Sequence, residues 1–334
     1  MPSMKLSMLR LTALLCCLFA CVVQAAPNPV LQRPYDLDTG HGVLRGTLLL
    51  PQEATPPPVA LLVAGSGPTD RDGNNPEGGR NAYLQRLAEA LAAQGIASVR
   101  YDKRGIAQSR PAAPHEEQLS VEGYANDVAA WSKQLASDPR FGPQVLVGHS
   151  EGALIASLAA PHTKASALVL IAGSGRPIDQ VLRDQLSVRL PPPLLAQADS
   201  LLDQLRAGHQ QPLVPKFLQA LFRPSVQPYL ISLFRYDPAQ ALAQVRQPTL
   251  ILQGTHDIQV EVADAQRLQW AKPDAELRLI GGMNHVLRIV AADPAQQLAS
   301  YNNPQLPLAR ELVESLAGFI RRTTSQNGQN PGTS

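Results

Sequence analysis

The order of strand and helix signals along the chain constrains the fold more than any other feature of the sequence. Short apolar runs at residues 59–64, 96–101 and 145–147 indicate buried strands. Apolar residues at helical spacing fill residues 81–94 and 120–137 between them. When a helix connects two strands in this way, the two strands pair in parallel and the helix packs across one face of the sheet. The sequence therefore predicts an α/β fold with a mostly parallel central sheet and helices on both faces.

The same alternation continues on both sides of this central part. Further strands are expected at residues 43–50, 167–171, 249–252 and 277–280, and further helices at residues 151–160, 260–270 and 307–320. Between about residues 175 and 245 the alternation stops, and only helical stretches punctuated by proline are found. We therefore expect one domain over residues 26–322 with a helical insertion at about 175–245. The tail 323–334, rich in Asn, Gly and Ser, is expected to be disordered.

The first 25 residues have the features of an export signal. Lys5 and Arg10 give a positive start, and residues 11–23 form a run without charge. This run has the length of a signal-peptide core and is too short to span a bilayer comfortably. Small residues before the expected cleavage point, after Ala25 or Ala26, complete the pattern. We expect a periplasmic or secreted protein with no stable membrane span.

Two alternatives for the leader stay open. Residues 18–21 form an alternative lipoprotein signal in which Cys21 would be lipidated, and the whole leader could also remain as an uncleaved anchor. The other two cysteines, Cys16 and Cys17, lie in the leader as well. A chain cleaved after Ala25 therefore has no disulfide, no thiol nucleophile and no thiolate metal site.

Outside the leader, the chain has no excess of positive charge that would attract a nucleic acid or an anionic membrane. Lys5 and Arg10 are two of the 29 basic residues, so the rest of the chain carries 27 basic and 27 acidic residues. Aromatic residues make up only 4% of the chain, and stacking surfaces for single-stranded nucleic acid are not expected. We expect a small-molecule substrate and no nucleic-acid partner.

The chemistry of the chain is concentrated at residues 148–152, which read G-H-S-E-G. This segment lies between a strand signal and a helix signal, which is the context that a G-x-S-x-G nucleophile turn requires. Such a sharp turn holds Ser150 in a strained backbone conformation at the carboxyl edge of the sheet. Gly148 and Gly152 avoid collisions with the neighbouring strand and helix. The helix start also points free N–H groups at the place where negative charge develops.

Together with two other segments, this turn resembles the α/β-hydrolase superfamily, and in particular its bacterial serine-esterase branch. That branch carries G-S-G-P-x-D-R-D-G-N, D-x-R-G and G-H-S-E-G, which stand here at residues 65–74, 102–105 and 148–152. The resemblance covers about residues 45–320. It implies an α/β-hydrolase fold with a helical cap and an acyl-serine mechanism, and it leaves the substrate open.

The resemblance also implies where the partners of Ser150 lie, since the superfamily order is nucleophile, acid, histidine. His285 follows the last predicted strand, at the family's position for the base. His162 is too near the helix predicted at 151–160, directly after the nucleophile turn, and His209 lies in the insertion. Asp257 directly follows the preceding strand in a turn that resembles the family's G-x-x-D. The serine hydroxyl needs such a base, and the acid holds the imidazole in the right tautomer.

Two backbone N–H groups are expected to form an oxyanion hole. One belongs to Glu151, immediately after the nucleophile. The other is expected from the loop after residues 59–64, at Ser66, with Gly67 as the alternative and a plain tight turn as the competing interpretation. Three interpretations of the Glu151 side chain remain open: that it is solvated, that it contacts a polar group of the substrate, or that it pairs with Arg104.

No cofactor and no metal are expected. Residues 65–67 lack the third glycine and the helix start of a dinucleotide fingerprint. The acidic segment 70–74 hints at calcium, but Asn75 and Asn81 replace the glycine and the glutamate of an EF-hand loop. A structured loop near the site is the favoured interpretation of this segment.

Several other residues have structural rather than chemical interpretations. Asp102 and Arg104 are expected to brace loops beside the elbow. Ala107 stands where the family loop has its second glycine, which leaves the local backbone geometry open. In the segment around Asp257, we expect Asp264 to be solvated and His256 to face away from the site.

The insertion is expected to cover the carboxyl edge of the sheet, where ligands bind in such folds. Its apolar residues offer a wall for an acyl or alkyl group, although most of them are expected to be core: Leu194, Leu195, Leu201, Leu202, Leu205, Phe217, Leu221 and Phe222. The sequence thus favours an exported carboxylesterase that cleaves short- to medium-chain esters. The alternatives are a peptidase or amidase, an acyltransferase or perhydrolase, and a non-catalytic carrier of the same fold.

Overall fold

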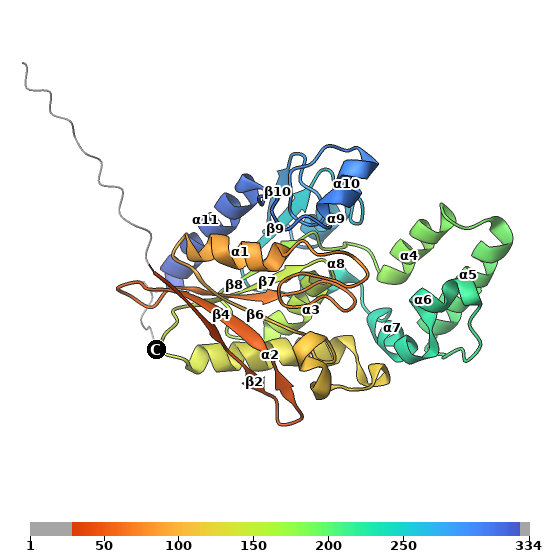
Figure 1. The fold of residues 1–334 in the computed structure, drawn as a ribbon, viewed down its shortest axis with the longest axis horizontal. Coiled ribbons are helices and arrows are strands. Elements are labelled where there is room, and N and C mark those ends of the chain that lie inside the picture. The colour runs from red at the N-terminus through yellow and green to blue at the C-terminus, as the bar shows by residue number, and fades with distance from the viewer. Residues whose placement is uncertain (1–28, 328–334) are drawn as a thin grey trace, which may run out of the picture.

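The computed structural model describes residues 29–327 (Figure 1). The predicted signal peptide at 1–25, with Cys21, and the last part of the predicted tail lie outside the described residues. Among the described residues, the helices are all too short or too polar to cross a membrane.

An eight-stranded sheet forms the centre of the molecule. Its strands lie in the order β1 (Val30–Pro34), β4 (Gly46–Pro51), β6 (Ala97–Tyr101), β5 (Val59–Val63), β7 (Gln144–His149), β8 (Ala167–Ile171), β9 (Thr249–Gly254) and β10 (Glu276–Ile280). The six strands from β6 to β10 in this order pair in parallel, while β4 pairs antiparallel with β6 and β1 antiparallel with β4. The predicted mostly parallel sheet is confirmed.

The predicted strand at 43–50 is interrupted at Arg45. Its first part, β3 (Val43–Leu44), pairs with β2 (Leu37–Asp38) in a separate two-stranded sheet, and only the second part joins the central sheet as β4. The amide of Arg45 donates to the hydroxyl of Ser109 instead of to a strand.

Helices cover both faces of the sheet, as predicted (Figure 1). Alternate residues of β5 show why: Val59, Leu61 and Val63 pack in one apolar cluster, and Ala60 and Leu62 pack in a second. The first cluster takes in α2 (Val121–Ser137), α3 (Glu151–Ala159) and α9 (Val262–Ala271). The second takes in α1 (Tyr83–Ala92) and α11 (Arg310–Asn327). β5 is therefore buried on two sides, which explains its continuous apolar run.

The last helix is longer than the sequence predicted. We expected it to end near Ile320 and to be followed by a disordered tail at 323–334. In the structure α11 continues to Asn327. Within it, the hydroxyls of Thr323 and Thr324 donate hydrogen bonds to backbone carbonyls one turn earlier in the helix. The helix therefore extends past the predicted boundary at residue 322, and residues 328–334 lie outside the described part.

The insertion between β8 and β9 forms a helical cap. It contains α4 (Ile178–Ser187), α5 (Pro192–Arg206), α6 (Gln219–Phe222), α7 (Gln227–Leu233) and α8 (Pro238–Ala243). Figure 1 shows α4 to α7 projecting to one side of the sheet. Every residue of this insertion is described, and none of it is strand. The cap has an apolar cluster of its own, which also includes Leu154 of α3 and so joins the cap to the sheet domain.

Candidate active site

Ser150 lies on a sharp turn between β7 and α3. Its backbone has φ +55° and ψ −122°, a left-handed conformation that is costly for a residue with a side chain. A Cβ on Gly148 would lie 2.2 Å from the carbonyl oxygen of Gly152, and a Cβ on Gly152 would lie 2.3 Å from that of Val63. Both glycines are therefore required by close backbone contacts, and the predicted strained turn is confirmed.

Asp257 and His285 come from the loops after β9 and β10, which are neighbouring parallel strands. The two loops are joined by backbone hydrogen bonds from Thr255 to Ile280 (3.1 Å) and from His256 to Met283 (3.0 Å). His285 Nδ1 lies 2.8 Å from Asp257 Oδ2, and both side chains are buried. The predicted pair is thus brought together by the carboxyl edge of the sheet.

The surroundings of Asp257 keep its carboxylate ionised. Its Oδ1 accepts the backbone amides of Gln259 (2.8 Å) and Val260 (3.0 Å). Burial alone would raise the pKa of Asp257, but the nearby His285 and these hydrogen bonds outweigh burial and hold the pKa below its ordinary value. A carboxylate can only accept, so Nδ1 of His285 carries the proton and Nε2 is left with a free lone pair.

Ser150 and His285 line the same small cavity of about 110 Å³. Within residues 29–327 the Ser150 hydroxyl makes no hydrogen bond to His285, and the contact between them would form as a substrate is bound, when such bonds shorten. Ser66 lines this cavity too, whereas Gly67 does not. Gly65 lies against the nucleophile, since a Cβ there would be 3.2 Å from the Cβ of Ser150.

The two expected oxyanion residues lie beside the nucleophile. Glu151 is the first residue of α3, where backbone N–H groups have no partner within the helix. Ser66, Glu151 and Ser150 all line a second cavity, which is larger than the first. Because Ser66 also lines the small cavity that Ser150 shares with His285, it is better placed than Gly67 to supply the second N–H.

The side chain of Glu151 has a partner that the sequence analysis did not consider. It is paired with Lys103, whose Nζ lies 3.4 Å from Glu151 Oε1. Arg104 instead makes a bidentate pair with Asp127, with distances of 2.9 and 2.5 Å. Lys103 was no more than the variable position of the D-x-R-G segment, and nothing in that pattern indicated that it would be buried at the site.

His149 is a second residue that the sequence did not single out. It is only 3% exposed, and its Nε2 lies 2.9 Å from the backbone carbonyl of His285. Its ring lies between those of Tyr83 and His285, with centroid distances of 4.4 and 4.8 Å. Burial, and after it the neighbouring His285, lowers the pKa of His149 to about 3, so this ring stays neutral.

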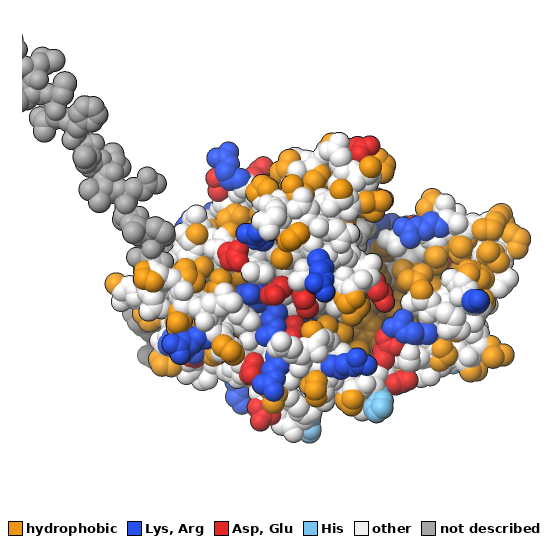
Figure 2. All heavy atoms as spheres, viewed as in Figure 1, with side chains coloured by type: hydrophobic (Ala, Val, Ile, Leu, Met, Phe, Trp, Pro, Cys, Tyr) orange, Lys and Arg blue, Asp and Glu red, His pale blue; other side chains and the backbone are white. Residues whose placement is uncertain are grey.

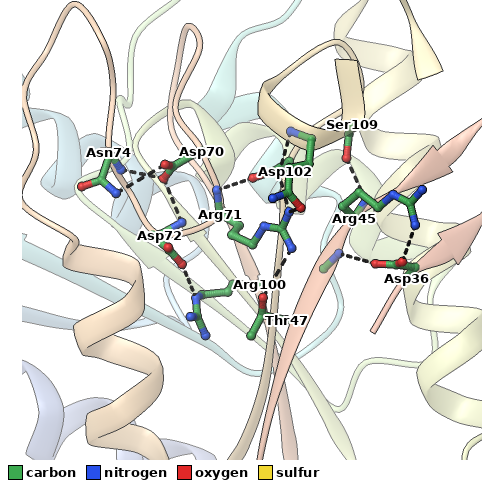
Figure 3. Close-up of polar contacts among 12 residues, drawn as sticks. Asp36, Arg45, Thr47, Asp70, Arg71, Asp72, Asn74, Arg100, Asp102 and Ser109 are labelled. Atoms are coloured by element: carbon green, nitrogen blue, oxygen red, sulfur yellow. Dashed lines mark hydrogen bonds and ion pairs between the residues drawn. The ribbon is translucent and has the colours of Figure 1, made fainter. Parts of the chain in front are cut away.

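The acidic segment at 70–74 forms a structured loop, as predicted (Figure 3). Asp70 Oδ1 accepts the backbone amides of Asp72 (2.9 Å) and Asn74 (2.8 Å). Asp72 pairs with Arg100 at 2.8 Å. The carboxylates of this segment are therefore committed to partners within the protein.

Asp102 and Arg104 brace neighbouring loops, as expected. Asp102 accepts both the backbone amide and the guanidinium of Arg71, each at 2.7 Å, and the backbone amide of Gln108 at 3.1 Å (Figure 3). The pair of Arg104 and Asp127 ties the same region to α2. These contacts fix the loops that follow β5 and β6.

Three further expectations can be compared with the structure. Ala107 has a positive φ of +42°, a backbone conformation that favours glycine. His256 turns away from the site, and its Nδ1 lies 2.7 Å from the carbonyl of Val290. Asp264 is not solvated: it is 2% exposed and pairs with Arg176 at 3.0 Å. That prediction is wrong because the insertion, which the sequence could not place, folds back over α9.

The larger cavity, of about 590 Å³, lies where the cap meets the sheet domain, and Figure 2 shows the surface hollowed there. Its apolar lining includes Leu154 of α3, Val181 and Leu182 of α4, and Leu230 and Leu233 of α7. Of the eight cap residues suggested by the sequence as a wall, only Leu221 lines it. Leu201, Leu202, Leu205 and Phe222 instead form the core of the cap.

Comparisons with known proteins give a consistent result. Residues 79–218 match the family model described as serine aminopeptidase, S33. Esterase EstD of Thermotoga maritima is 27% identical over 250 residues, which are 73% of this chain and 58% of that protein. The chain thus spans less than two thirds of the length of this curated relative.

Solved structures with the same fold include Est1E and a serine hydrolase without a lid. Est1E from Butyrivibrio proteoclasticus is 14% identical, with a TM-score of 0.56 over 87% of this chain and 99% of that one. An α/β serine hydrolase without a lid from Xanthomonas campestris is 17% identical, with a TM-score of 0.51 over 92% and 100% of the two chains. At these identities the likeness shows a shared fold.

Proposed function

We propose that the chain is a serine hydrolase of the α/β-hydrolase superfamily and that it cleaves carboxylic esters. Ser150 is the nucleophile, His285 the general base and Asp257 the acid that orients it. The observation that carries the proposal is the 2.8 Å contact between His285 Nδ1 and Asp257 Oδ2, beside a cavity that His285 shares with the strained Ser150.

The reaction proceeds as a two-step acyl transfer. Ser150 Oγ attacks the ester carbonyl while Nε2 of His285 takes the hydroxyl proton, and the C–O bond to the alcohol then breaks as His285 returns that proton to the leaving oxygen. The backbone N–H groups of Glu151 and Ser66 stabilise the negative oxygen of the tetrahedral intermediate. Water attacks the acyl-enzyme by the same route and regenerates Ser150.

The larger cavity supports an ester with a short- to medium-length acyl group as the substrate. Its volume of about 590 Å³ lies in the range of small-molecule sites, and leucines and valines supply much of its wall. The proposal of export to the periplasm or the medium is supported by the sequence of residues 1–25 alone.

An aminopeptidase on the same triad is the second candidate, and the description of the matching family model favours it. A substrate panel separates the two. The purified protein is given p-nitrophenyl esters from acetate to dodecanoate, and aminoacyl p-nitroanilides as amides. We expect turnover of the esters with a maximum at short or medium chains, and none of the amides. Preferred cleavage of the anilides would assign the protein to the peptidases.

Two further alternatives need their own measurements. A non-catalytic carrier would leave Ser150 unlabelled by a fluorophosphonate probe, whereas we expect one label per wild-type chain. An acyltransferase or perhydrolase would pass the acyl group to an alcohol or to peroxide in preference to water. Product analysis with methanol as competitor is expected to give mostly free acid.

A further inference from the structure

Lys103 is a buried cation at the carboxyl edge of the sheet that the mechanism above does not use. It lies two residues after the end of β6 and is only 1% exposed. In the sheet β6 neighbours β5, and β5 neighbours β7. The three loops that follow these strands therefore meet, and they carry Lys103, Gly65 and the Ser150–Glu151 turn.

The ammonium group of Lys103 joins the other two loops. Nζ donates a 2.5 Å hydrogen bond to the carbonyl oxygen of Gly65 and lies 3.4 Å from Glu151 Oε1. It also lies 5.0 Å from the centroid of the Tyr124 ring. Burial lowers the pKa of Lys103, and the neighbouring Glu151 carboxylate partly offsets that effect. Burying an ammonium group costs free energy unless it is paired and hydrogen-bonded, and these contacts supply that compensation.

Both contacts lie next to the N–H groups of the proposed oxyanion hole: one is on Gly65, whose carbonyl shares a peptide group with the Ser66 N–H, and the other is on the side chain of Glu151. The carbonyl of Gly65 and the N–H of Ser66 are the two ends of one planar trans peptide group and point in opposite directions. A cation on the carbonyl oxygen fixes the plane of that group and draws electron density from its nitrogen, which makes the Ser66 N–H a stronger donor. The Glu151 carboxylate is on the residue that supplies the second N–H.

We propose that Lys103 is a positioning residue that holds the Ser66 and Glu151 amides in register as one oxyanion hole. This inference rests on the proposed function, because it assigns Lys103 a role only if those amides bind a developing oxyanion. Lys103 itself does not touch the reacting atoms in this role. It acts through the Gly65–Ser66 peptide on one side and through the Glu151 side chain on the other.

A residue with this role stabilises the transition state and leaves the binding of the substrate unchanged. In the variant Lys103→Met we therefore expect kcat for p-nitrophenyl acetate to fall by about 100-fold, which is the loss typical of one oxyanion donor, while KM stays within about two-fold. A trifluoromethyl ketone, which Ser150 converts to a tetrahedral oxyanion, should bind more weakly by a similar factor. Lys133→Met, at an exposed lysine of α2, is the matched control and should change neither value.

A second variant separates this role from simple neutralisation of Glu151. The double variant Lys103→Met/Glu151→Gln removes both charges, so no lone charge is left buried, and it is the deciding test if Lys103→Met does not fold. We expect it to fold and to keep the loss in kcat, because the Gly65 carbonyl still lacks its partner. Recovery of kcat to within a few-fold of wild type would overturn the proposal, as would equal effects on the trifluoromethyl ketone and on a ground-state inhibitor.

Ser150→Ala in the same assay distinguishes the two levels of inference. If Ser150→Ala abolishes turnover and Lys103→Met keeps full kcat, the role of Lys103 is wrong and the serine hydrolase stands. If Ser150→Ala keeps its turnover, the proposed function is wrong and the role of Lys103 falls with it.

Discussion

His149 Nε2 lies 2.9 Å from the backbone carbonyl oxygen of His285. A carbonyl oxygen can only accept, so this nitrogen carries a proton and donates it. The bond joins the residue before the nucleophile to the residue proposed as its base, across loops that are 136 positions apart in the sequence. It ties the elbow after β7 to the loop after β10 without using either reacting side chain.

The first prediction concerns the pH dependence of stability. Folded His149 stays neutral down to its pKa of about 3, whereas in the unfolded chain it binds a proton below its ordinary pKa of 6.5. The unfolded state therefore gains protons first, and this residue makes the fold less stable as the pH falls from 6.5 toward 3. His149→Phe loses the hydrogen bond to His285 and also loses this pH dependence.

Urea unfolding of wild type and His149→Phe measures this effect. We expect the variant to be less stable at about pH 7.5, and the difference to shrink by about 1 kcal/mol at about pH 5.5, since only the wild type is penalised there. A difference that stays constant between the two pH values would show that His149 binds a proton equally well in the folded and unfolded chains, which would contradict its burial as a neutral ring.

The second prediction concerns the tautomer of His285. In Asp257→Asn the amides of Gln259 and Val260 still require an acceptor, so the oxygen of the new side chain stays at their position. Its NH₂ group then faces His285 Nδ1 and forces that nitrogen to accept, which moves the imidazole proton to Nε2. The base is lost while the fold remains.

For Asp257→Asn we expect kcat to fall by about 10⁴-fold, as in other triads with this change, with an unfolding midpoint near that of wild type. Ester hydrolysis and thermal unfolding on the same preparation measure both. Retention of kcat within a few-fold would remove Asp257 from the triad.

The third prediction concerns the glycine after the nucleophile. In Gly152→Ala the added methyl carbon would lie 2.3 Å from the Val63 carbonyl oxygen and 2.7 Å from that of Ala64, and backbone atoms cannot move aside easily. We expect a loss of about 2 kcal/mol or more in the free energy of unfolding. Gly281→Ala is the matched control, because a Cβ there meets nothing within 4 Å. Equal stability of the two variants in urea would contradict the described packing of the elbow.

The fourth prediction concerns the length of the acyl group. Leu221 is half-exposed and lines the larger cavity, whereas Leu213, at 90% exposure, lies elsewhere on the cap. Leu221→Ser should lower kcat/KM for the octanoate ester by about five-fold and leave the acetate ester unchanged, because only the longer chain reaches this wall. Leu213→Ser should alter neither ester. A similar loss on both esters for Leu221→Ser would place this residue near the carbonyl rather than along the acyl chain.

The parts of the fold that the sequence predicted are those in which local pattern and tertiary burial agree. Residues 59–63 and 167–171 are continuous apolar runs because β5 and β8 are covered by helices on both faces. The elbow was predictable for a related reason, since its glycines are required by contacts within one strand–turn–helix unit. The choice of Asp257 and His285 followed from the resemblance to the superfamily, in which the acid and the histidine follow the nucleophile in this order.

The parts that were missed depend on contacts between distant segments. The edge strand β1 (Val30–Pro34) is largely exposed, pairs antiparallel on one side and ends in proline, so it has no apolar periodicity to recognise. Lys103 and His149 are polar residues in variable positions of their motifs. Their burial is set by neighbouring loops, which a pattern along one segment does not report.

The most direct test of the central claim is the rate of ester hydrolysis by Ser150→Ala. The variant removes only the nucleophilic oxygen from an otherwise unchanged turn, so we expect kcat for p-nitrophenyl acetate to fall on the order of a million-fold and labelling by the fluorophosphonate probe to disappear. Turnover by purified Ser150→Ala within ten-fold of wild type, or a probe label found on another residue, would contradict the assignment of Ser150.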